Sequence, residues 1–152
     1  MNKLAGPMLA FLLAGCMTQN PSRINYSLDE QLQRGDQAYR EARLDDAEQI
    51  YRTVVQDHPD LKEVWFRLGN IYTREDQLDA AVRCYEKDLQ LDPNDGRAWY
   101  NLSLVHMKQA VGTLELASRT LPAGSPYRDR IQELHDALLE RTGVPKQEES
   151  PP

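Results

Sequence analysis

The middle of the chain carries apolar residues at helical spacing, in short segments that are separated by turn residues. Apolar side chains recur three and four positions apart, which places them on one face of a helix. This pattern predicts helices near residues 28–41, 46–57, 61–74, 79–90 and 96–109. Helices this short are marginal in isolation, so we expect each of them to be stabilised by packing its apolar face against neighbours.

Polar residues at the expected helix starts are typical of capping. Ser27 precedes a glutamate by three residues, the spacing of a capping box in which the two side chains bond to backbone N–H groups reciprocally. Asp45 and Asp60 also precede a glutamate by three residues, so we expect them to cap helices as well. Pro59 and Pro93 end the helices before them, because proline cannot continue a helix.

The chain is similar to itself at an offset of 34 residues. The offset aligns large, small, glycine and proline positions at once: Trp65 with Trp99, Leu68 with Leu102, Gly35 with Gly69, Leu44 with Leu78, Ala47 with Ala81, Tyr51 with Tyr85, and Pro59 with Pro93. Such a period indicates units that each leave an apolar face for the next unit to cover. Glycine has no side chain, so Gly35 and Gly69 are expected to let two helices approach closely.

The clearest unit resembles a tetratricopeptide repeat (TPR). The resemblance rests on the segment from Trp65 to Tyr72, followed by Ala81, Tyr85 and Pro93. It extends over about residues 28–109. It implies an all-α fold, namely a short TPR solenoid with two clear repeats and a degenerate third.

The third repeat departs from the pattern. Ser103 replaces the glycine and His106 replaces the tyrosine, so we expect His106 to be packed in the core. A second helix of this repeat matches only if two residues are inserted, so that Leu114, Ala117 and Leu121 align with Leu78, Ala81 and Tyr85. Ser125 and Pro126 then predict the start of a last helix, which caps the array.

The first residues have the pattern of a targeting signal. A lysine precedes an apolar run from Leu4 to Ala14, which is too short to span a bilayer. The alternative is a buried N-terminal helix, which Gly6 and Pro7 would weaken. The end of the run, residues 13–16, resembles the lipobox of bacterial lipoproteins, and Cys16 would then carry the lipid.

This resemblance implies cleavage before Cys16, covalent lipid on its thiol and amine, and anchoring in a membrane. Met17 stands where an aspartate would retain such a protein in the inner membrane, so the outer membrane is expected, with the domain facing the periplasm. The predicted organisation is a signal peptide over 1–15, a lipidated N-terminus and tether over 16–26, a TPR domain over 27–142 and a disordered tail over 143–152.

Composition and chemistry indicate a binding protein, not an enzyme. The net charge is −6 over 152 residues, which argues against nucleic-acid binding. The three histidines share no metal-ligand spacing, and no phosphate loop or nucleophile motif is present, so no metal, cofactor or catalytic residue is expected. Cys84 is either buried and inert or free to pair between chains.

In the TPR family the first helix of each repeat lines a concave groove that binds protein segments. Carrying these positions over gives four columns, with Asn101 beside them: Leu32, Phe66 and Tyr100; Asp36, Asn70 and Leu104; Tyr39, Thr73 and Met107; and Arg40, Arg74 and Lys108. We expect the two aromatic residues of the first column to anchor a partner and the two asparagines to bond its backbone. The basic row and the asparagines have a second explanation, since they are common in this repeat for stability alone. Family members that clamp a C-terminal carboxylate have a lysine in place of Phe66, so a full clamp is not expected.

The resulting hypothesis is an adaptor that binds an envelope protein and helps to assemble a multiprotein machine such as a secretion system or pilus. One alternative is an adaptor that docks peptidoglycan enzymes at the outer membrane. Another, from a different class, is a hydrolase with an unrecognised site. Self-association is left open by the sequence.

Overall fold

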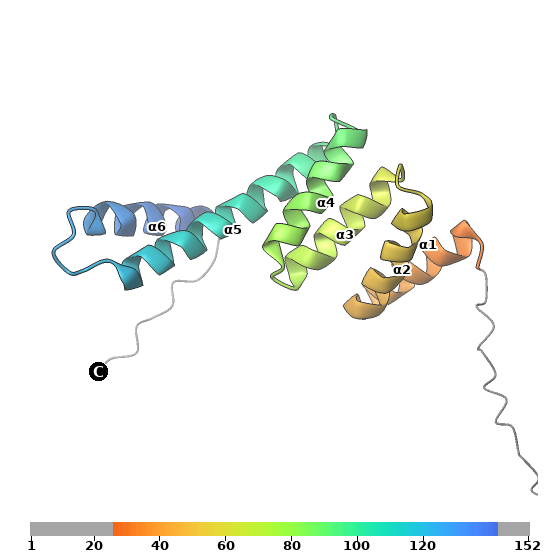
Figure 1. The fold of residues 1–152 in the computed structure, drawn as a ribbon, viewed down its shortest axis with the longest axis horizontal. Coiled ribbons are helices and arrows are strands. Elements are labelled where there is room, and N and C mark those ends of the chain that lie inside the picture. The colour runs from red at the N-terminus through yellow and green to blue at the C-terminus, as the bar shows by residue number, and fades with distance from the viewer. Residues whose placement is uncertain (1–25, 143–152) are drawn as a thin grey trace, which may run out of the picture.

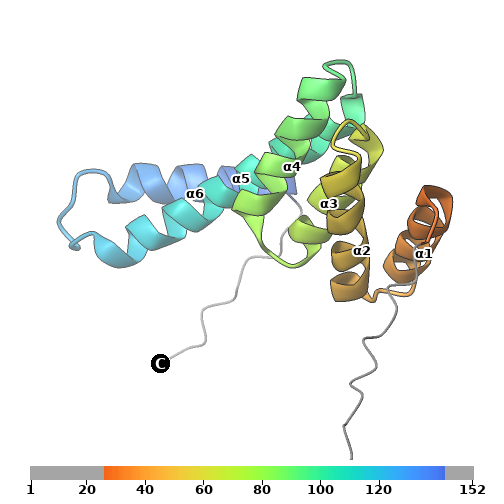
Figure 2. The same cartoon turned by 45° about the vertical axis from the view of Figure 1, so that its right-hand side comes forward.

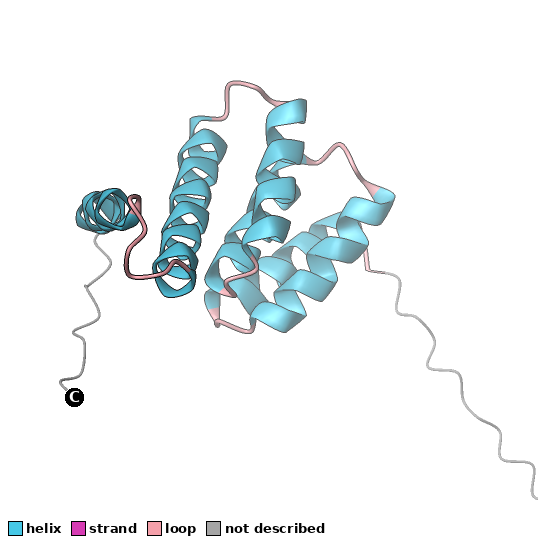
Figure 3. Cartoon of the chain, turned by 60° about the vertical axis from the view of Figure 1, so that its left-hand side comes forward, coloured by secondary structure: helices cyan, strands magenta, loops and turns pink. Residues whose placement is uncertain are grey.

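The computed structural model describes residues 26–142 and contains helices and loops only in that range (Figure 3). The predictions for the signal, Cys16, the tether and the tail concern residues outside it. The helices are α1 (Leu28–Arg40), α2 (Leu44–Asp57), α3 (Lys62–Arg74), α4 (Leu78–Leu91), α5 (Gly96–Thr120) and α6 (Arg128–Thr142).

Successive helices pack side by side, so the core runs along the stack instead of filling one centre. One buried cluster lies among α1, α2 and α3 and includes Tyr51, Leu68 and Ile71. A second cluster joins α4 to the first half of α5 through Tyr85 and Leu102. Figures 1 and 2 show α1 to α4 stacked in order, with α5 leading away from them and α6 beside its second half. The expected all-α solenoid is confirmed.

Two glycines set the distance between the helices of each pair, as predicted. A Cβ added to Gly35 would lie 2.6 Å from a ring carbon of Tyr51, and one added to Gly69 would lie 2.5 Å from a ring carbon of Tyr85. Both tyrosines are fully buried. The period of 34 residues therefore repeats an aromatic ring packed flat on glycine backbone.

The helix starts differ in part from the predicted caps. Ser27 forms the full capping box with Glu30. Asp45 does not cap α2, because the helix begins at Leu44. Asp45 therefore lies in the first turn, where it interacts with the helix dipole. Asp60 does not cap α3 either, since Leu61 occupies that position without a side-chain bond. Asp95 does cap α5, because its side chain accepts the backbone N–H groups of Arg97 and Ala98.

The largest departure from the prediction is α5, which continues to Thr120 instead of ending near residue 109. The first two repeats turn at Ala42 and Asp76, both in the left-handed region with φ of 57° and 60°. The equivalent position, Ala110, stays helical. No proline interrupts this segment, and alanine at this position does not decide the outcome, since Ala42 turns in the first repeat while Ala110 continues the helix. The third repeat therefore has no separate second helix.

The side chains that this missing helix would cover are exposed. His106 is exposed and approaches Gln109, so the prediction that it is packed in the core is wrong. Ser103 is exposed as well, and its hydroxyl donates to the carbonyl oxygen of Trp99 at 2.8 Å. The last helix, α6, packs against α5 and begins at Arg128, two residues later than predicted. The hydroxyl oxygen of Ser125 accepts the N–H of Tyr127 in the preceding turn, at 3.4 Å.

Candidate protein-binding groove

The predicted groove residues lie on α1, α3 and α5, and the structure brings six of them around one hollow. The hollow has a volume of about 310 Å³, and Tyr85 completes its wall. Its predicted lining residues are Tyr39, Asn70, Thr73, Arg74, Asn101 and Leu104. Residues from three helices that are distant in sequence thus share one concavity.

A second hollow continues the first along α5. It has a volume of about 430 Å³ and shares Thr73 and Leu104 with the first hollow. Its walls come from the turn between α3 and α4 and from the second half of α5, and its lining includes Leu78, Val105, Lys108, Val111 and Gly112. We call the two hollows together the groove. The residues that line its first part are mainly polar ones, whereas its second part exposes mainly apolar surface.

The polar side chains of the groove bond to one another. Asn70 accepts the hydroxyl of Tyr85 and the amide of Asn101 through one oxygen, both at 2.8 Å. The Thr73 hydroxyl lies 3.1 Å from the same tyrosine oxygen. The two asparagines thus hold α3, α4 and α5 together. Of the two explanations that the sequence left open for them, this bonding supports the structural one.

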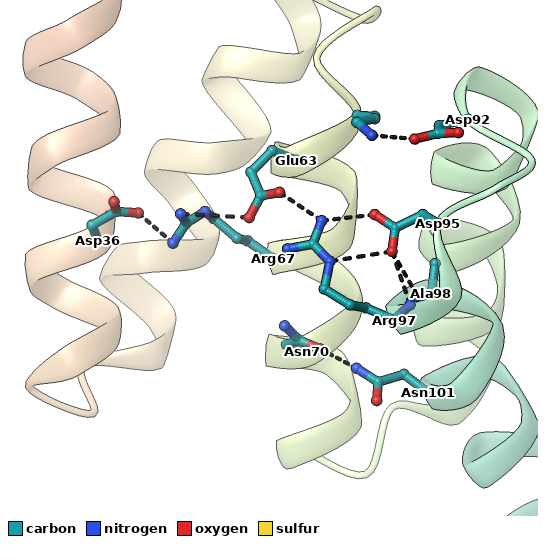
Figure 4. Close-up of polar contacts among 10 residues, drawn as sticks. Asp36, Glu63, Arg67, Asn70, Asp92, Asp95, Arg97, Ala98 and Asn101 are labelled. Carbon is teal, nitrogen blue, oxygen red and sulfur yellow. Dashed lines mark hydrogen bonds and ion pairs between the residues drawn. The ribbon is translucent and has the colours of Figure 1, made fainter.

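A chain of ion pairs runs across the stack beside the groove (Figure 4). Arg67 pairs with Asp36 at 2.7 Å and approaches Glu63 at 3.5 Å, and Glu63 pairs in turn with Arg97 at 2.9 Å. Arg97 also pairs with Asp95 at 2.7 Å. Asp36, a predicted groove residue, is therefore engaged by Arg67 and by the hydroxyl of Tyr51.

Only one of the two expected aromatic anchors is open. The ring of Phe66 packs on the ring of Tyr85, with 5.9 Å between their centroids. The guanidinium of Arg97 also lies over the Phe66 ring, 4.4 Å from its centroid. Tyr100 is 65% exposed. Sequence reasoning missed Arg97, although its position next to the aromatic column on α5 is the signal that could have indicated the cation–π contact.

The remaining predicted residues are distributed along the same helices. Leu32 is half-buried against the core, and Met107 is half-buried on α5. In the basic row, Lys108 pairs with Asp76 at 2.7 Å, and Arg40 donates to Gln37 at 2.8 Å. Arg74 lies 5.1 Å from the ring centroid of Tyr39 and has no carboxylate partner in the described part of the chain.

The sequence of this region matches a known repeat family. A family model described as a TPR repeat matches residues 69–109, from the second half of α3 through α4 into α5. The fold is a short TPR solenoid. A search among curated proteins found no match. A match to this repeat favours a role as a protein-interaction adaptor or scaffold.

Outside the TPR groove, the described residues form neither a metal site nor a membrane-spanning helix. Within residues 26–142, no three His, Cys, Asp or Glu side chains come together as a metal site would require. No helix in that range is both long and apolar enough to cross a membrane. Burial raises the pKa of the Cys84 thiol to about 12, so it is held as an unreactive core residue.

The structure also contains a buried carboxylate that sequence reasoning missed. Asp88 on α4 is 0% exposed, and neither of its side-chain oxygens has a hydrogen-bond partner in the described range. Burial raises its pKa to about 6, and the negative charge of Asp95 adds to the effect. The offset of 34 residues could have indicated it, because the first repeat has Val54 at this core position.

Proposed function

We propose that this protein is a lipid-anchored adaptor of the bacterial envelope whose groove binds a segment of another envelope protein. Cys16 carries the lipid, the outer membrane holds the lipid, and the TPR domain faces the periplasm. The segment belongs to a multiprotein machine such as a secretion system or a pilus, which the adaptor helps to assemble or position.

The observation that carries the binding role is the continuous groove. Leu104 exposes apolar surface of α5 in the first hollow, and Tyr100 is exposed on the same helix outside the lining, while Arg74 offers that hollow a guanidinium that no carboxylate of the described residues engages. Aromatic and arginine side chains are the residues most often responsible for binding energy at interfaces. The apolar second hollow, with Leu78 and Val111, gives room for further side chains of the bound segment. The groove thus supports a bound segment that places an acidic group near Arg74 and apolar residues beyond Leu104.

The binding role is tested by placing a photoreactive amino acid at Leu104 in the full-length protein and identifying the crosslinked segment. A peptide of that segment is then titrated against the Tyr100→Ala variant. Loss of an anchoring aromatic residue should cost about 2 kcal/mol of binding free energy, or roughly a 30-fold weaker Kd. Tyr127→Ala is the matched control, because this tyrosine is 61% exposed but lies in the turn before α6. Equal affinity of both variants would place the binding site elsewhere.

The anchor is tested separately, by metabolic labelling with radioactive palmitate. A lipobox cysteine carries a diacylglycerol through a thioether and a further acyl chain through an amide, without a thioester, so we expect label that survives neutral hydroxylamine and disappears in Cys16→Ser. Cys84→Ser should keep the label and serves as the control, since Cys84 is buried. Absence of label in the wild-type protein would refute the anchor without affecting the groove.

A further inference from the structure

The third TPR repeat presents a helix-binding face that no helix of the described chain covers. Trp65 and Trp99 occupy equivalent positions in the second and third repeats. Their indole N–H groups donate to the carbonyl oxygens of Pro59 and Pro93, each at 2.9 Å, so both rings are held in the same way. Trp65 is half-buried against the core, whereas Trp99 is 53% exposed.

Two further positions on α5 repeat this difference. Gly69 lies directly under the ring of Tyr85 from α4, but its equivalent Ser103 is exposed. Tyr72 is half-buried, packs against the cluster that contains Ala81 and Tyr85 of α4, and donates to Glu48 of α2 at 2.8 Å, but its equivalent His106 is exposed. The three exposed residues Trp99, Ser103 and His106 recur at helical spacing along one side of α5, and we call this the open face.

The stack itself indicates what the open face receives. α2 packs against α1 and α4 packs against α3, and in both pairs the second helix covers the glycine of the first. α5 continues this stack through its contact with α4, so the open face continues an interface that the chain already forms twice. We propose that an amphipathic helix of a partner protein binds to the open face and completes the third repeat.

The residues around the open face restrict the chemistry of this helix. Ser103 has a side chain where the first two repeats have glycine, so an aromatic ring cannot approach as Tyr85 approaches Gly69; the helix carries alanine, glycine or serine there. Val82 of α4 replaces Glu48 in the equivalent position, which makes the face more apolar. Glu86 of α4 replaces Arg52 at its edge, so the helix carries a lysine or arginine on that side.

The open face is distinct from the groove. The groove residues on α5 are Asn101, Leu104 and Lys108, whereas the open face is formed by a different row of that helix. One adaptor can therefore bind two segments at once, one in the groove and one on the open face. The inference does not depend on the proposed groove, and either site can fail alone in experiment.

The test places a photoreactive amino acid at Ser103 of the full-length protein in the cells that naturally produce it. After irradiation, the crosslinked segment is mapped by mass spectrometry. We expect a segment of another protein with apolar residues three and four positions apart, a small residue near the crosslink and a basic residue at its edge. No crosslink, crosslinks only between copies of this chain, or a segment without helical periodicity would overturn the proposal.

A peptide of the mapped segment provides the second measurement. It is titrated into the full-length Trp65→Phe variant, in which Trp99 is the remaining tryptophan. We expect the fluorescence emission of Trp99 to shift to the blue as the peptide covers its indole ring. Ser103→Trp, whose bulk occupies the face, should weaken binding at least about tenfold. Tyr127→Ala, which changes an exposed residue in the turn before α6, should bind as the parent does. Unchanged binding by Ser103→Trp, with an unaltered circular dichroism spectrum, would refute the proposal.

Discussion

The carboxylate of Asp88 is buried without a hydrogen-bond partner among the described residues, and replacing it should stabilise the fold. Burying an ionised group without compensation is costly, so the protein responds by raising the pKa of the group. Asp88 faces Lys62 and Glu63 at the start of α3 and Asp95 and Arg97 at the start of α5. The two cations lower its pKa, but burial, the largest effect, and the two anions outweigh them.

The free-energy cost of burying Asp88 follows from the difference between its pKa values in the unfolded and folded states. The pKa of Asp88 is near 3.8 in the unfolded chain and about 6 in the folded one, so folding opposes its ionisation. Stability is therefore unaffected by this group below pH 3.8, falls as the pH rises towards 6, and stays low above 6. The penalty is about 3 kcal/mol at pH 7.5 and about half of that at pH 5.

Asp88→Val copies the residue that the first repeat has at this position, Val54. Urea unfolding of residues 26–142, followed by circular dichroism, should show a gain of about 3 kcal/mol at pH 7.5 that shrinks to about half at pH 5. Val54→Asp is the reciprocal control and should destabilise the protein more at pH 7.5 than at pH 5. A destabilised Asp88→Val would show that the carboxylate has a stabilising partner, and a gain independent of pH would show that folding does not raise its pKa; either result would refute the reasoning.

Two further predictions concern packing and reactivity. Gly69→Ala should destabilise the protein by about 1–3 kcal/mol in the same urea assay, because its Cβ would lie 2.5 Å from a ring carbon of Tyr85. Gly112→Ala should instead stabilise the protein by up to about 1 kcal/mol, because its Cβ would meet nothing within 4 Å, and equal effects of the two substitutions would disprove the close approach. The Cys84 thiol, whose pKa is raised to about 12, should react with iodoacetamide at pH 8 only in the unfolded protein, and rapid labelling of the native protein would contradict its burial.

The sequence was sufficient to predict the paired helices because their signals are local or strictly periodic. Gly35 and Tyr51 recur as Gly69 and Tyr85, and each pair forms the same close contact. The end of α5 was not predictable in the same way. The turn at Asp76 depends on a left-handed residue, and Ala110 at the equivalent position gives no sign of whether the chain turns or continues.

The sequence predicted which residues lie near the groove, but not which of their side chains are already engaged by other residues of the chain. Six of the residues in the predicted columns meet in one hollow. Periodicity does not reveal which side chains are already engaged, because those partners come from other repeats: Phe66 is covered by Arg97, and Asp36 is paired with Arg67. The second hollow was not foreseen, since it depends on α5 continuing past Ala110.

The straight course of α5 accounts for both candidate binding surfaces. If the chain turned at Ala110 as it turns at Ala42 and Asp76, Val111 and Gly112 would leave the wall that they form opposite the turn between α3 and α4, and the apolar half of the groove would be lost. A helix that returned along α5 would also cover Trp99, which is 53% exposed, since the equivalent Trp65 packs against the cluster that includes Cys84 of α4. One missing turn thus lengthens the groove and leaves the third repeat open, so a degenerate repeat gives this short array more surface for partners than a regular repeat would.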